Sequence, residues 1–184
     1  GIERDKAELE RFVSENRSWL PDYALFMALK RHFGMKAWFD WPDEEARLHK
    51  PEAVGKYAEL LHEDVRFFEY SQFLFFKQWD ALHEYAKAHG VKIIGDMPIY
   101  VAMDSADVWA SPEFFLLDEK NVPVEVAGVP PDYFSEDGQL WGNPLYDYDA
   151  MRRDGYGWWI RRVDGASKLC DILRIDHFRG FESF

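Results

Sequence analysis

The ten residues from Asp171 to Gly180, DILRIDHFRG, change character halfway along. They begin like a buried strand, and their later part crowds together an aspartate, a histidine and two arginines. A strand in a core stays apolar, and a strand with one face in water alternates apolar and polar residues. This run does neither, so its charged half needs an explanation from the rest of the chain.

The first 90 residues carry apolar residues at helical spacing. Gly34 predicts a helix end, while Pro42 followed by acids and Pro51 followed by a glutamate predict helix starts. A long helix is expected over Asp64–His89, with Gly90 ending it. Its apolar stripe is expected to pack into the core and consists of Phe68, Phe75, Phe76, Trp79, Leu82 and Tyr85.

Two short apolar runs follow the helices, at Val91–Val101 (VKIIGDMPIYV) and Cys170–Asp176 (CDILRID). A further helix is expected over Asp149–Leu169, directly before the second run. Strands joined through helices are typical of α/β folds with a parallel sheet. The sequence therefore predicts an α/β fold, with a mostly helical segment at residues 1–90 and a segment with the strands at residues 91–184.

The segment between the first strand and that helix, residues 100–148, is too long for an ordinary connection of ~2–6 residues. A hairpin is expected from Phe114–Asp118 (FFLLD) through a turn at Glu119–Asn121 to Val122–Val126 (VPVEV). Residues 127–146 are rich in Gly and Pro with little periodicity, so they are expected to form a loop. Loops of this kind over the edge of a sheet are commonly functional.

Composition excludes several classes of function. The net charge of -12 argues against a nucleic-acid partner, and no run approaches the ~20 apolar residues of a membrane span. The single cysteine, Cys170, lies in an apolar run, is expected to be a core residue and is compatible with a reducing cytoplasm. Motifs for dinucleotides, P-loops, zinc and serine hydrolysis are absent. The histidines of the helical part are expected to be solvated: His32, His49, His62, His83 and His89.

Two strand ends carry groups suited to chemistry. Asp96 ends the first strand, and strand alternation places Arg174 and Asp176 on one face at the end of the second. A guanidinium near a carboxylate favours its ionised form, as a nucleophile attacking an acetal carbon requires. His177 offers a donor for a sugar hydroxyl. The alternatives are structural: Asp96 as the cap of a turn and Asp176 in a buried ion pair.

The loop Pro130–Pro144 mixes aromatic and hydrogen-bonding residues. Rings can stack on the CH faces of a sugar while amides and carboxylates bind its hydroxyls. An aromatic-anchored structural loop explains the composition equally well. The candidate sugar contacts of this loop are Asp132, Tyr133, Phe134, Gln139, Trp141 and Asn143.

Three stretches together resemble the 4-α-glucanotransferase family, which includes amylomaltases and disproportionating enzymes and is related to the α-amylases. They are IIGDMPIYVAMDSADVW, VPPDYFSEDGQLWGNPLYDY and LRIDHFRGFES, and the resemblance covers about residues 64–184. The resemblance implies part of a (β/α)8 TIM barrel, about its third and fourth strands with preceding helices and an inserted loop subdomain. Both ends of the sequence look like cuts within a larger catalytic domain.

The resemblance also implies roles. Asp176 would be the nucleophile, and Arg174 would orient it. Asp96 would bind donor sugar, and His177 would bind sugar beside the nucleophile. Asp132, Gln139 and Trp141 match donor-side contacts, and Tyr133 and Phe134 match the tip of a lid that favours sugar over water as acceptor. Asn143 remains a candidate from the loop composition.

The implied reaction is retaining transfer of α-1,4-glucan segments among maltooligosaccharides, amylose or glycogen-type glucans, without metal or cofactor, in the cytoplasm. Retaining chemistry also needs a protonated acid, which in this family follows later strands, beyond Phe184. Glu182 does not match it, so the chain alone is expected to lack turnover. An α-amylase-type hydrolase ranks second because Asp96–Val101 lacks the usual Asn and His of those enzymes. A non-catalytic glucan-binding fragment is the remaining alternative.

Overall fold

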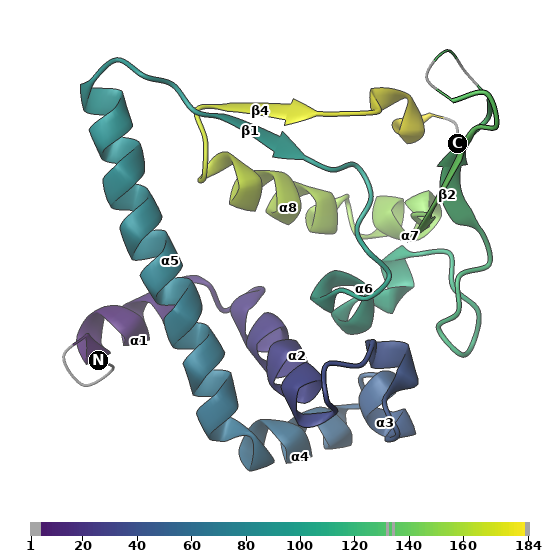
Figure 1. Ribbon diagram of the computed structural model, residues 1–184. Coiled ribbons are helices and arrows are strands. Elements are labelled where there is room, and N and C mark those ends of the chain that lie inside the picture. The colour runs from purple at the N-terminus through teal and green to yellow at the C-terminus, as the bar shows by residue number, and fades with distance from the viewer. Residues whose placement is uncertain (1–4, 132, 134, 183–184) are drawn as a thin grey trace. The chain divides into compact units, whose positions relative to one another are not determined.

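The computed structural model describes residues 5–131, 133 and 135–182, which fall into two compact units (Figure 1). The first unit spans residues 1–81 and the second spans residues 82–184. Helix α5 (His62–Ala88) contributes to both units. No helix in the described ranges is both long enough and apolar enough to cross a membrane.

The first unit is helical, as the sequence predicts. It contains α1 (Lys6–Glu15), α2 (Leu20–His32), α3 (Glu44–Arg47), α4 (Pro51–Leu60), a 3-10 turn at Trp38–Asp40 and the first part of α5. The predicted boundaries are confirmed at several places. Asp43 caps α3 by accepting from the backbone N–H of Ala46, Pro51 opens α4, and Gly34 follows α2 in the left-handed region, at φ +71°.

The core of the first unit forms where α1 and α2 turn their apolar faces inward. Phe12 of α1 lies against Phe73 and Phe76 of α5, with ring centroids 5.9 and 5.5 Å apart. The largest fully buried side chains of this unit are Leu9, Leu20, Leu29, Trp38 and Trp41. Burial of such large apolar side chains is the main favourable term in folding this unit.

The second unit contains both predicted strands. Strand β1 (Ile94–Met97) pairs in parallel with β4 (Ile172–Ile175), and the register places Asp96 opposite Arg174. Helix α8 (Gly157–Ser167) contacts both strands and lies along one face of the pair (Figure 1). The α/β prediction is therefore confirmed for these elements.

Shorter elements complete the second unit. They are α6 (Ala106–Ala110), a 3-10 turn at Pro112–Phe114, the antiparallel strands β2 (Val126–Val129) and β3 (Gln139–Pro144), α7 (Tyr148–Arg153) and a 3-10 turn at Phe178–Phe181. Tyr146, Trp158 and Trp159 form an aromatic core next to the segment that follows β1 and are each less than 9% exposed.

One prediction about this unit is wrong. The single helix expected over Asp149–Leu169 is interrupted, because Gly155 and Tyr156 adopt positive φ values of 63° and 59° between α7 and α8. The hairpin expected at residues 114–126 is confirmed only next to its turn, where Leu117 and Pro123 form an isolated antiparallel bridge. The Asp118 N–H donates to the oxygen of Val122 at 2.8 Å and the Val124 N–H to that of Leu116 at 2.9 Å, and Pro123 has no N–H to add.

The hairpin ladder instead forms between β2 and β3, inside the stretch predicted to be a loop. Gly128 allows the strands to approach, since a Cβ there would lie 2.5 Å from the backbone oxygen of Gln139. Gly138 adopts φ +72° at the end of the connection, a conformation that glycine adopts readily. Glycines and prolines that suggest a loop are here the residues that permit the turn and the close approach.

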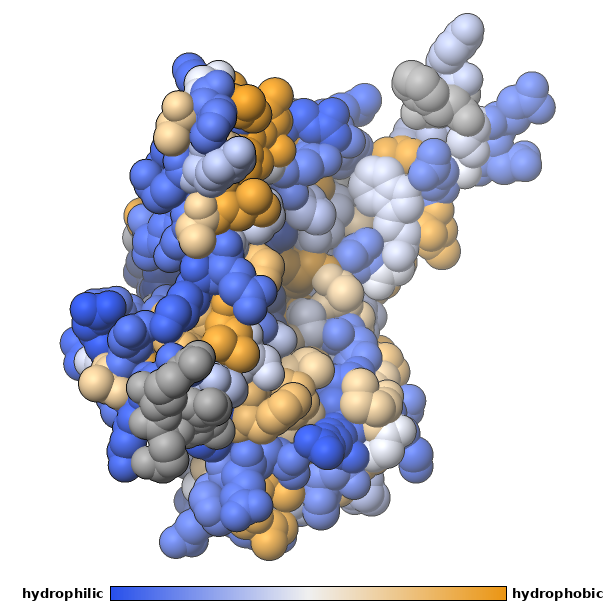
Figure 2. All heavy atoms as spheres, turned by 60° about the vertical axis from the view of Figure 1, so that its left-hand side comes forward, coloured by the Kyte–Doolittle hydropathy of each residue, from blue (hydrophilic) through white to orange (hydrophobic). Residues whose placement is uncertain are grey.

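The aromatic stripe predicted as the core face of α5 is only partly covered. Phe75, Leu82 and Tyr85 are 46%, 53% and 64% exposed, so the prediction is wrong for these residues. The described elements leave this flank of the helix open. Figure 2 shows hydrophobic side chains at the surface among hydrophilic ones on the face that it presents.

Two further predictions concern single residues. Cys170 is 8% exposed, which confirms that it is a core residue. His83 is 7% exposed and bound to Asp171, so the prediction that it is solvated is wrong. The helical pattern could not reveal this contact because the two residues lie 88 positions apart in the sequence.

Candidate active site

The carboxyl ends of β1 and β4 bring three predicted site residues together. Arg174 binds Asp96 with two parallel hydrogen bonds, from Nε to Oδ1 at 3.1 Å and from Nη2 to Oδ2 at 2.8 Å. The same Nη2 lies 3.6 Å from Oδ2 of Asp176. One guanidinium thus stands between two carboxylates, and its closer partner is Asp96.

These three side chains are open to solvent. The exposed fractions are 56% for Asp96, 59% for Arg174 and 75% for Asp176. Hydrogen bonds from Arg174 lower the pKa of Asp96, and the same bonds raise the pKa of Arg174. Asp96 and Arg174 are therefore both charged near neutral pH, and all three side chains are accessible to a ligand.

Asp176 is held by the backbone that follows β4. The backbone N–H of His177 donates to Oδ1 of Asp176 at 2.9 Å. His177 itself adopts left-handed angles, φ 52° and ψ 45°, which are uncommon for a residue with a side chain. This turn ends the strand and fixes both the carboxylate and the imidazole beside it.

The β2–β3 hairpin reaches the same place through Trp141. The Trp141 ring meets the His177 imidazole edge to face, with centroids 5.0 Å apart. Its indole Nε1 donates to Oε1 of Gln139 at 2.9 Å, which links two predicted sugar contacts of β3. Trp141 is 38% exposed, so part of its ring remains available for stacking.

The other predicted loop residues are placed differently. The side-chain amide of Asn143 donates to the backbone oxygen of Val101 at 2.8 Å and ties β3 to the segment after β1. Tyr133 is 98% exposed on the connection between β2 and β3. Asp132 and Phe134 lie outside the described residues.

Sequence reasoning missed the residues that support this site. The hydroxyl of Tyr146 donates to the backbone oxygen of Ile99 at 2.6 Å. Arg162 donates from Nη1 to that hydroxyl oxygen at 2.8 Å and from Nη2 to the oxygen of Pro98 at 2.5 Å. Arg162 of α8 therefore holds the segment that leaves β1. Its place in the WWIRR run gives no signal for this role, since only the βαβ arrangement brings it under the strand end.

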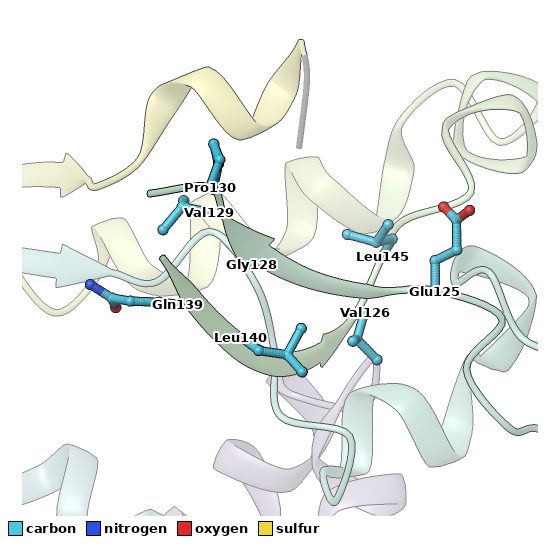
Figure 3. Close-up of a pocket in the computed structure, with 8 residues that line it drawn as sticks. All are labelled: Glu125, Val126, Gly128, Val129, Pro130, Gln139, Leu140 and Leu145. Atoms are coloured by element: carbon cyan, nitrogen blue, oxygen red, sulfur yellow. The ribbon is translucent and has the colours of Figure 1, made fainter. Parts of the chain in front are cut away.

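A cavity of about 500 Å³ lies on the hairpin (Figure 3) and is mainly apolar. Its lining residues are Glu125, Val126, Gly128, Val129, Pro130, Gln139, Leu140 and Leu145. Of the predicted site residues that the structure describes, Gln139 alone borders it. The polar groups of the strand ends are thus separate from this cavity. Among the described residues, no cluster of His, Cys, Asp and Glu is arranged to hold a metal ion.

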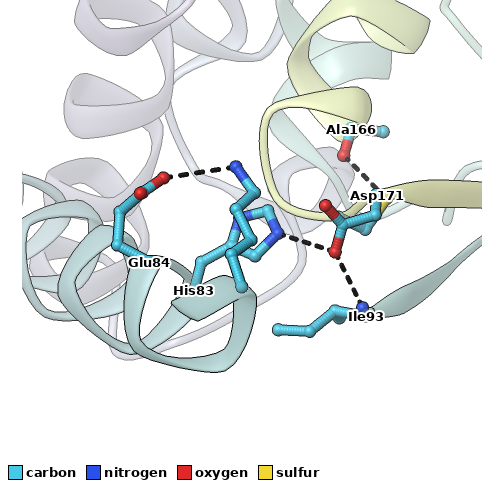
Figure 4. Close-up of polar contacts among 7 residues, drawn as sticks. His83, Glu84, Ile93, Ala166 and Asp171 are labelled. Atoms are coloured by element: carbon cyan, nitrogen blue, oxygen red, sulfur yellow. Dashed lines mark hydrogen bonds and ion pairs between the residues drawn. The ribbon is translucent and has the colours of Figure 1, made fainter. Parts of the chain in front are cut away.

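The amino end of the strand pair has a polar cluster of its own (Figure 4). Oδ2 of Asp171 accepts from the backbone N–H of Ile93 at 2.8 Å and lies 3.0 Å from Nε2 of His83. The pKa of Asp171 is lowered mainly by the hydrogen bond from the Ile93 N–H and, to a smaller extent, by the one with His83. This cluster joins α5, β1 and β4 in one contact.

The α/β unit thus places acids and an arginine at the carboxyl ends of adjacent parallel strands, which is where barrel enzymes hold their active sites. The family model described as 4-alpha-glucanotransferase matches residues 2–184. The chain belongs to this 4-alpha-glucanotransferase family.

Individual relatives agree with that result. The chain is 47% identical over 182 residues to the 4-alpha-glucanotransferase of Clostridium butyricum, covering 98% of this chain and 37% of that protein. It is 55% identical over 166 residues to that of Thermus thermophilus, covering 90% of this chain and 33% of that protein. The chain thus spans about a third of the length of the curated relatives it matches.

A solved structure supports the fold. The amylomaltase of Streptococcus agalactiae, solved in complex with acarbose, superposes with a TM-score of 0.91 at 47% identity, covering 97% of this chain and 36% of that one. The chain therefore has the fold of part of a (β/α)8 barrel, as the sequence predicts.

Proposed function

We propose that this chain supplies the nucleophile side of a 4-α-glucanotransferase active site. The observation that carries the proposal is the guanidinium of Arg174, which contacts Asp96 and Asp176 at the carboxyl ends of adjacent parallel strands. Membership of the 4-alpha-glucanotransferase family supports the assignment of the reaction. In this proposal Asp176 is the nucleophile, Arg174 orients it, and Asp96 binds the donor sugar.

The reaction proceeds in two displacements. The Asp176 carboxylate attacks the anomeric carbon of an α-1,4-glucan, and the bond to the leaving 4-oxygen breaks as that oxygen takes a proton from a general acid. The 4-hydroxyl of a second glucan then attacks the glycosyl ester and returns its proton to the same group. Net retention results from the two inversions, and an acceptor on the same chain gives a cyclic glucan.

The chain covers only about a third of the length of each relative. The general acid is therefore proposed to lie outside residues 1–184. Glu182 follows the 3-10 turn after β4 and does not match the family's acid. The chain alone is therefore expected to bind glucan without turning it over. A glucan-binding fragment is the second candidate for the chain in isolation, and hydrolysis is the second candidate for the complete enzyme.

The donor sugar is expected to stack on Trp141 and to bind His177, Gln139 and Tyr133, with Asp132 and Phe134 contributing from outside the described residues. Asn143 is a weaker candidate, because its amide already donates to Val101. The solved amylomaltase that superposes on the chain holds acarbose, which supports a glucan ligand. The proposed substrates are maltooligosaccharides, amylose and glycogen-type glucans, in the cytoplasm.

The test uses two proteins. One is the chain itself, and the other is a chimera in which the chain replaces the matching segment of the Clostridium butyricum relative. Both are incubated with maltotriose, and the products are read by mass spectrometry. The chimera is expected to yield glucose and a ladder of longer maltooligosaccharides, and the chain is expected to leave maltotriose unchanged. Maltose and glucose without longer products from the chimera would contradict the transferase assignment.

A further inference from the structure

Strand β3 carries an irregularity where it passes the candidate site. Between the pair Val126–Pro144 and the pair Gly128–Leu140, the chain advances by two residues on β2 and by four residues on β3. Such a bulge interrupts the ladder, and bulges beside active sites re-aim the side chains that they contain. The residues inside this bulge are Trp141, Gly142 and Asn143.

Gly142, in the middle of the bulge, sets its backbone angle. Its φ is +77°, in the left-handed region, which glycine adopts readily and other residues rarely adopt. A Cβ added at Gly142 would meet no atom within 4 Å, so lack of space is not the reason for a glycine here. The buried Pro144 ends the bulge and favours extended angles at Asn143. The path of the bulge is therefore specified by its own sequence.

The two ends of the bulge contact the two segments that carry the candidate site. Trp141 meets the His177 imidazole edge to face, with ring centroids 5.0 Å apart. Asn143 donates from Nδ2 to the backbone oxygen of Val101 at 2.8 Å. The first residue of the bulge thus contacts the turn that follows β4, and its last residue binds the segment that follows β1.

The segment that follows β1 is a fixed support for this hydrogen bond. It leaves the sheet, so its backbone oxygens have no ladder partner and need other donors. Arg162 donates to the oxygen of Pro98 at 2.5 Å, and the hydroxyl of Tyr146 donates to that of Ile99 at 2.6 Å. The hydrogen bond to Val101 therefore fastens the hairpin to a stretch of backbone that two other side chains already hold.

We propose that Asn143 is a positioning residue for Trp141. Its hydrogen bond to Val101 fixes one end of the bulge. The angle at Gly142 then directs the indole ring of Trp141 against the imidazole of His177. The ring is 38% exposed and is held as a surface on which a sugar can stack. The statement about stacking rests on the proposed function, whereas the statement about the placement of the ring does not.

Nuclear magnetic resonance of the isotope-labelled chain tests the ring placement without any substrate. Nuclear Overhauser cross-peaks between indole and imidazole protons report the contact, and Trp141→Phe and His177→Gln assign them. Asn143→Asp keeps the size of the side chain and replaces the N–H donor with an oxygen. It is expected to lower the ratio of docked to displaced Trp141 rings about threefold to tenfold and to weaken the cross-peaks accordingly. Unchanged cross-peaks in Asn143→Asp, or none in the wild-type chain, would overturn the proposal.

Gly142→Ala is a second variant, in which the Cβ strains the bulge without a steric clash. Gly155→Ala is its matched control, because Gly155 has φ +63° between α7 and α8 and its Cβ would also meet no atom within 4 Å. Both variants are expected to lower the melting temperature by similar amounts, and only Gly142→Ala is expected to weaken the cross-peaks between Trp141 and His177. Equal cross-peaks in the two variants would contradict the role of the bulge in placing the ring.

Acarbose binding to the chimera tests whether Asn143 acts through Trp141. Asn143→Asp is expected to weaken the binding about threefold to tenfold when Trp141 is present, and less than about twofold in Trp141→Ala. Asn121→Asp, which makes the same exchange in the turn between Leu117 and Pro123, is the control and should leave the binding unchanged. Equal losses with and without the Trp141 ring would overturn the coupling. A wild-type chimera that does not bind acarbose would contradict the proposed function and leave the result on ring placement standing.

Discussion

Both ends of the β1–β4 pair carry aspartates with polar partners, but the two ends differ in how far these side chains are exposed. At the amino end, the Asp171 carboxylate is 19% exposed and is occupied by the Ile93 N–H and His83. At the carboxyl end, the side chains of Asp96, Arg174 and Asp176 are all more than half exposed. The amino-end cluster binds only the protein itself, whereas the carboxyl-end cluster has lone pairs and N–H groups left for a ligand.

This difference shows how one strand pair serves two purposes. The amino-end contacts fix the register that begins with Ile94 opposite Ile172, and that register places Asp96 opposite Arg174 two residues further on. Carboxyl ends of parallel strands face the active site in barrel enzymes, and residues at the opposite end serve stability. Variants at the two ends should therefore separate loss of chemistry from loss of folding.

The largest expected effect is at Asp176. Asp176→Asn in the chimera should lower the rate of maltotriose disproportionation by ~10³-fold or more, because the amide cannot form the glycosyl ester. The melting temperature should be unchanged, since the side chain is 75% exposed. Asp164→Asn on α8, whose carboxylate is 63% exposed in a pair with Lys168, is the matched control and should retain full activity.

The next effect is at Arg174. Arg174→Lys keeps the positive charge but loses the planar fork that binds Asp96 through two nitrogens. The turnover number of the chimera should fall about tenfold to a hundredfold. Arg152→Lys, in an exposed pair with Asp149, provides the comparison. Equal activities for the two lysine variants would show that the fork has no role in the chemistry.

A substitution at the amino end of the strand pair is expected to change folding stability. Asp171→Asn should lower the melting temperature of the chain by several degrees, because the amide replaces an ionised acceptor of the Ile93 N–H. The pKa of Asp171 is lower in the folded state than in the unfolded state, where it is about 3.9. The ionised carboxylate therefore stabilises the fold at a pH above the unfolded pKa, and this stabilisation is lost as the pH falls through the folded pKa.

Thermal melts from about pH 6 down to about pH 2 check the sign of this contribution. The difference in melting temperature between the wild-type chain and Asp171→Asn should shrink as the pH falls below about 4. Asp164→Asn serves again as the control. A difference that grows toward acid pH would contradict the assignment of Asp171 as an ionised structural group.

The smallest expected effect is at Tyr133, which is 98% exposed. Tyr133→Ala should leave the melting temperature unchanged and should raise hydrolysis relative to transfer about twofold to fivefold. The reason is that the Tyr133 ring is proposed to form part of a lid that keeps water from acting as the acceptor. The measurement is the ratio of new reducing ends to transfer products from maltotriose in the chimera. An unchanged ratio would remove Tyr133 from the site.

The sequence predicted the elements that have strong local signals. Gly34, Pro51 and Gly90 mark helix boundaries by backbone chemistry, and the change from apolar to charged residues marks the end of β4. Strand alternation predicted that Arg174 and Asp176 share one face, whereas the pairing of Arg174 with Asp96 was found only in the register of β1 and β4.

Contacts between distant residues could not be predicted from local patterns. His83 with Asp171, and Arg162 with Tyr146, depend on how helices pack against the strand pair. The β2–β3 ladder was missed because its glycines and prolines suggest a loop until the close approach at Gly128 is seen.

Trapping of the covalent intermediate tests most directly whether the carboxyl end of the strand pair holds the nucleophile. The chimera is incubated with a slow fluorinated glucosyl fluoride, digested, and searched by mass spectrometry for a peptide that carries a glycosyl ester. An adduct is expected on Asp176, and no adduct is expected in Asp176→Asn. An adduct on Asp96 or on any other carboxylate of an active chimera would contradict it.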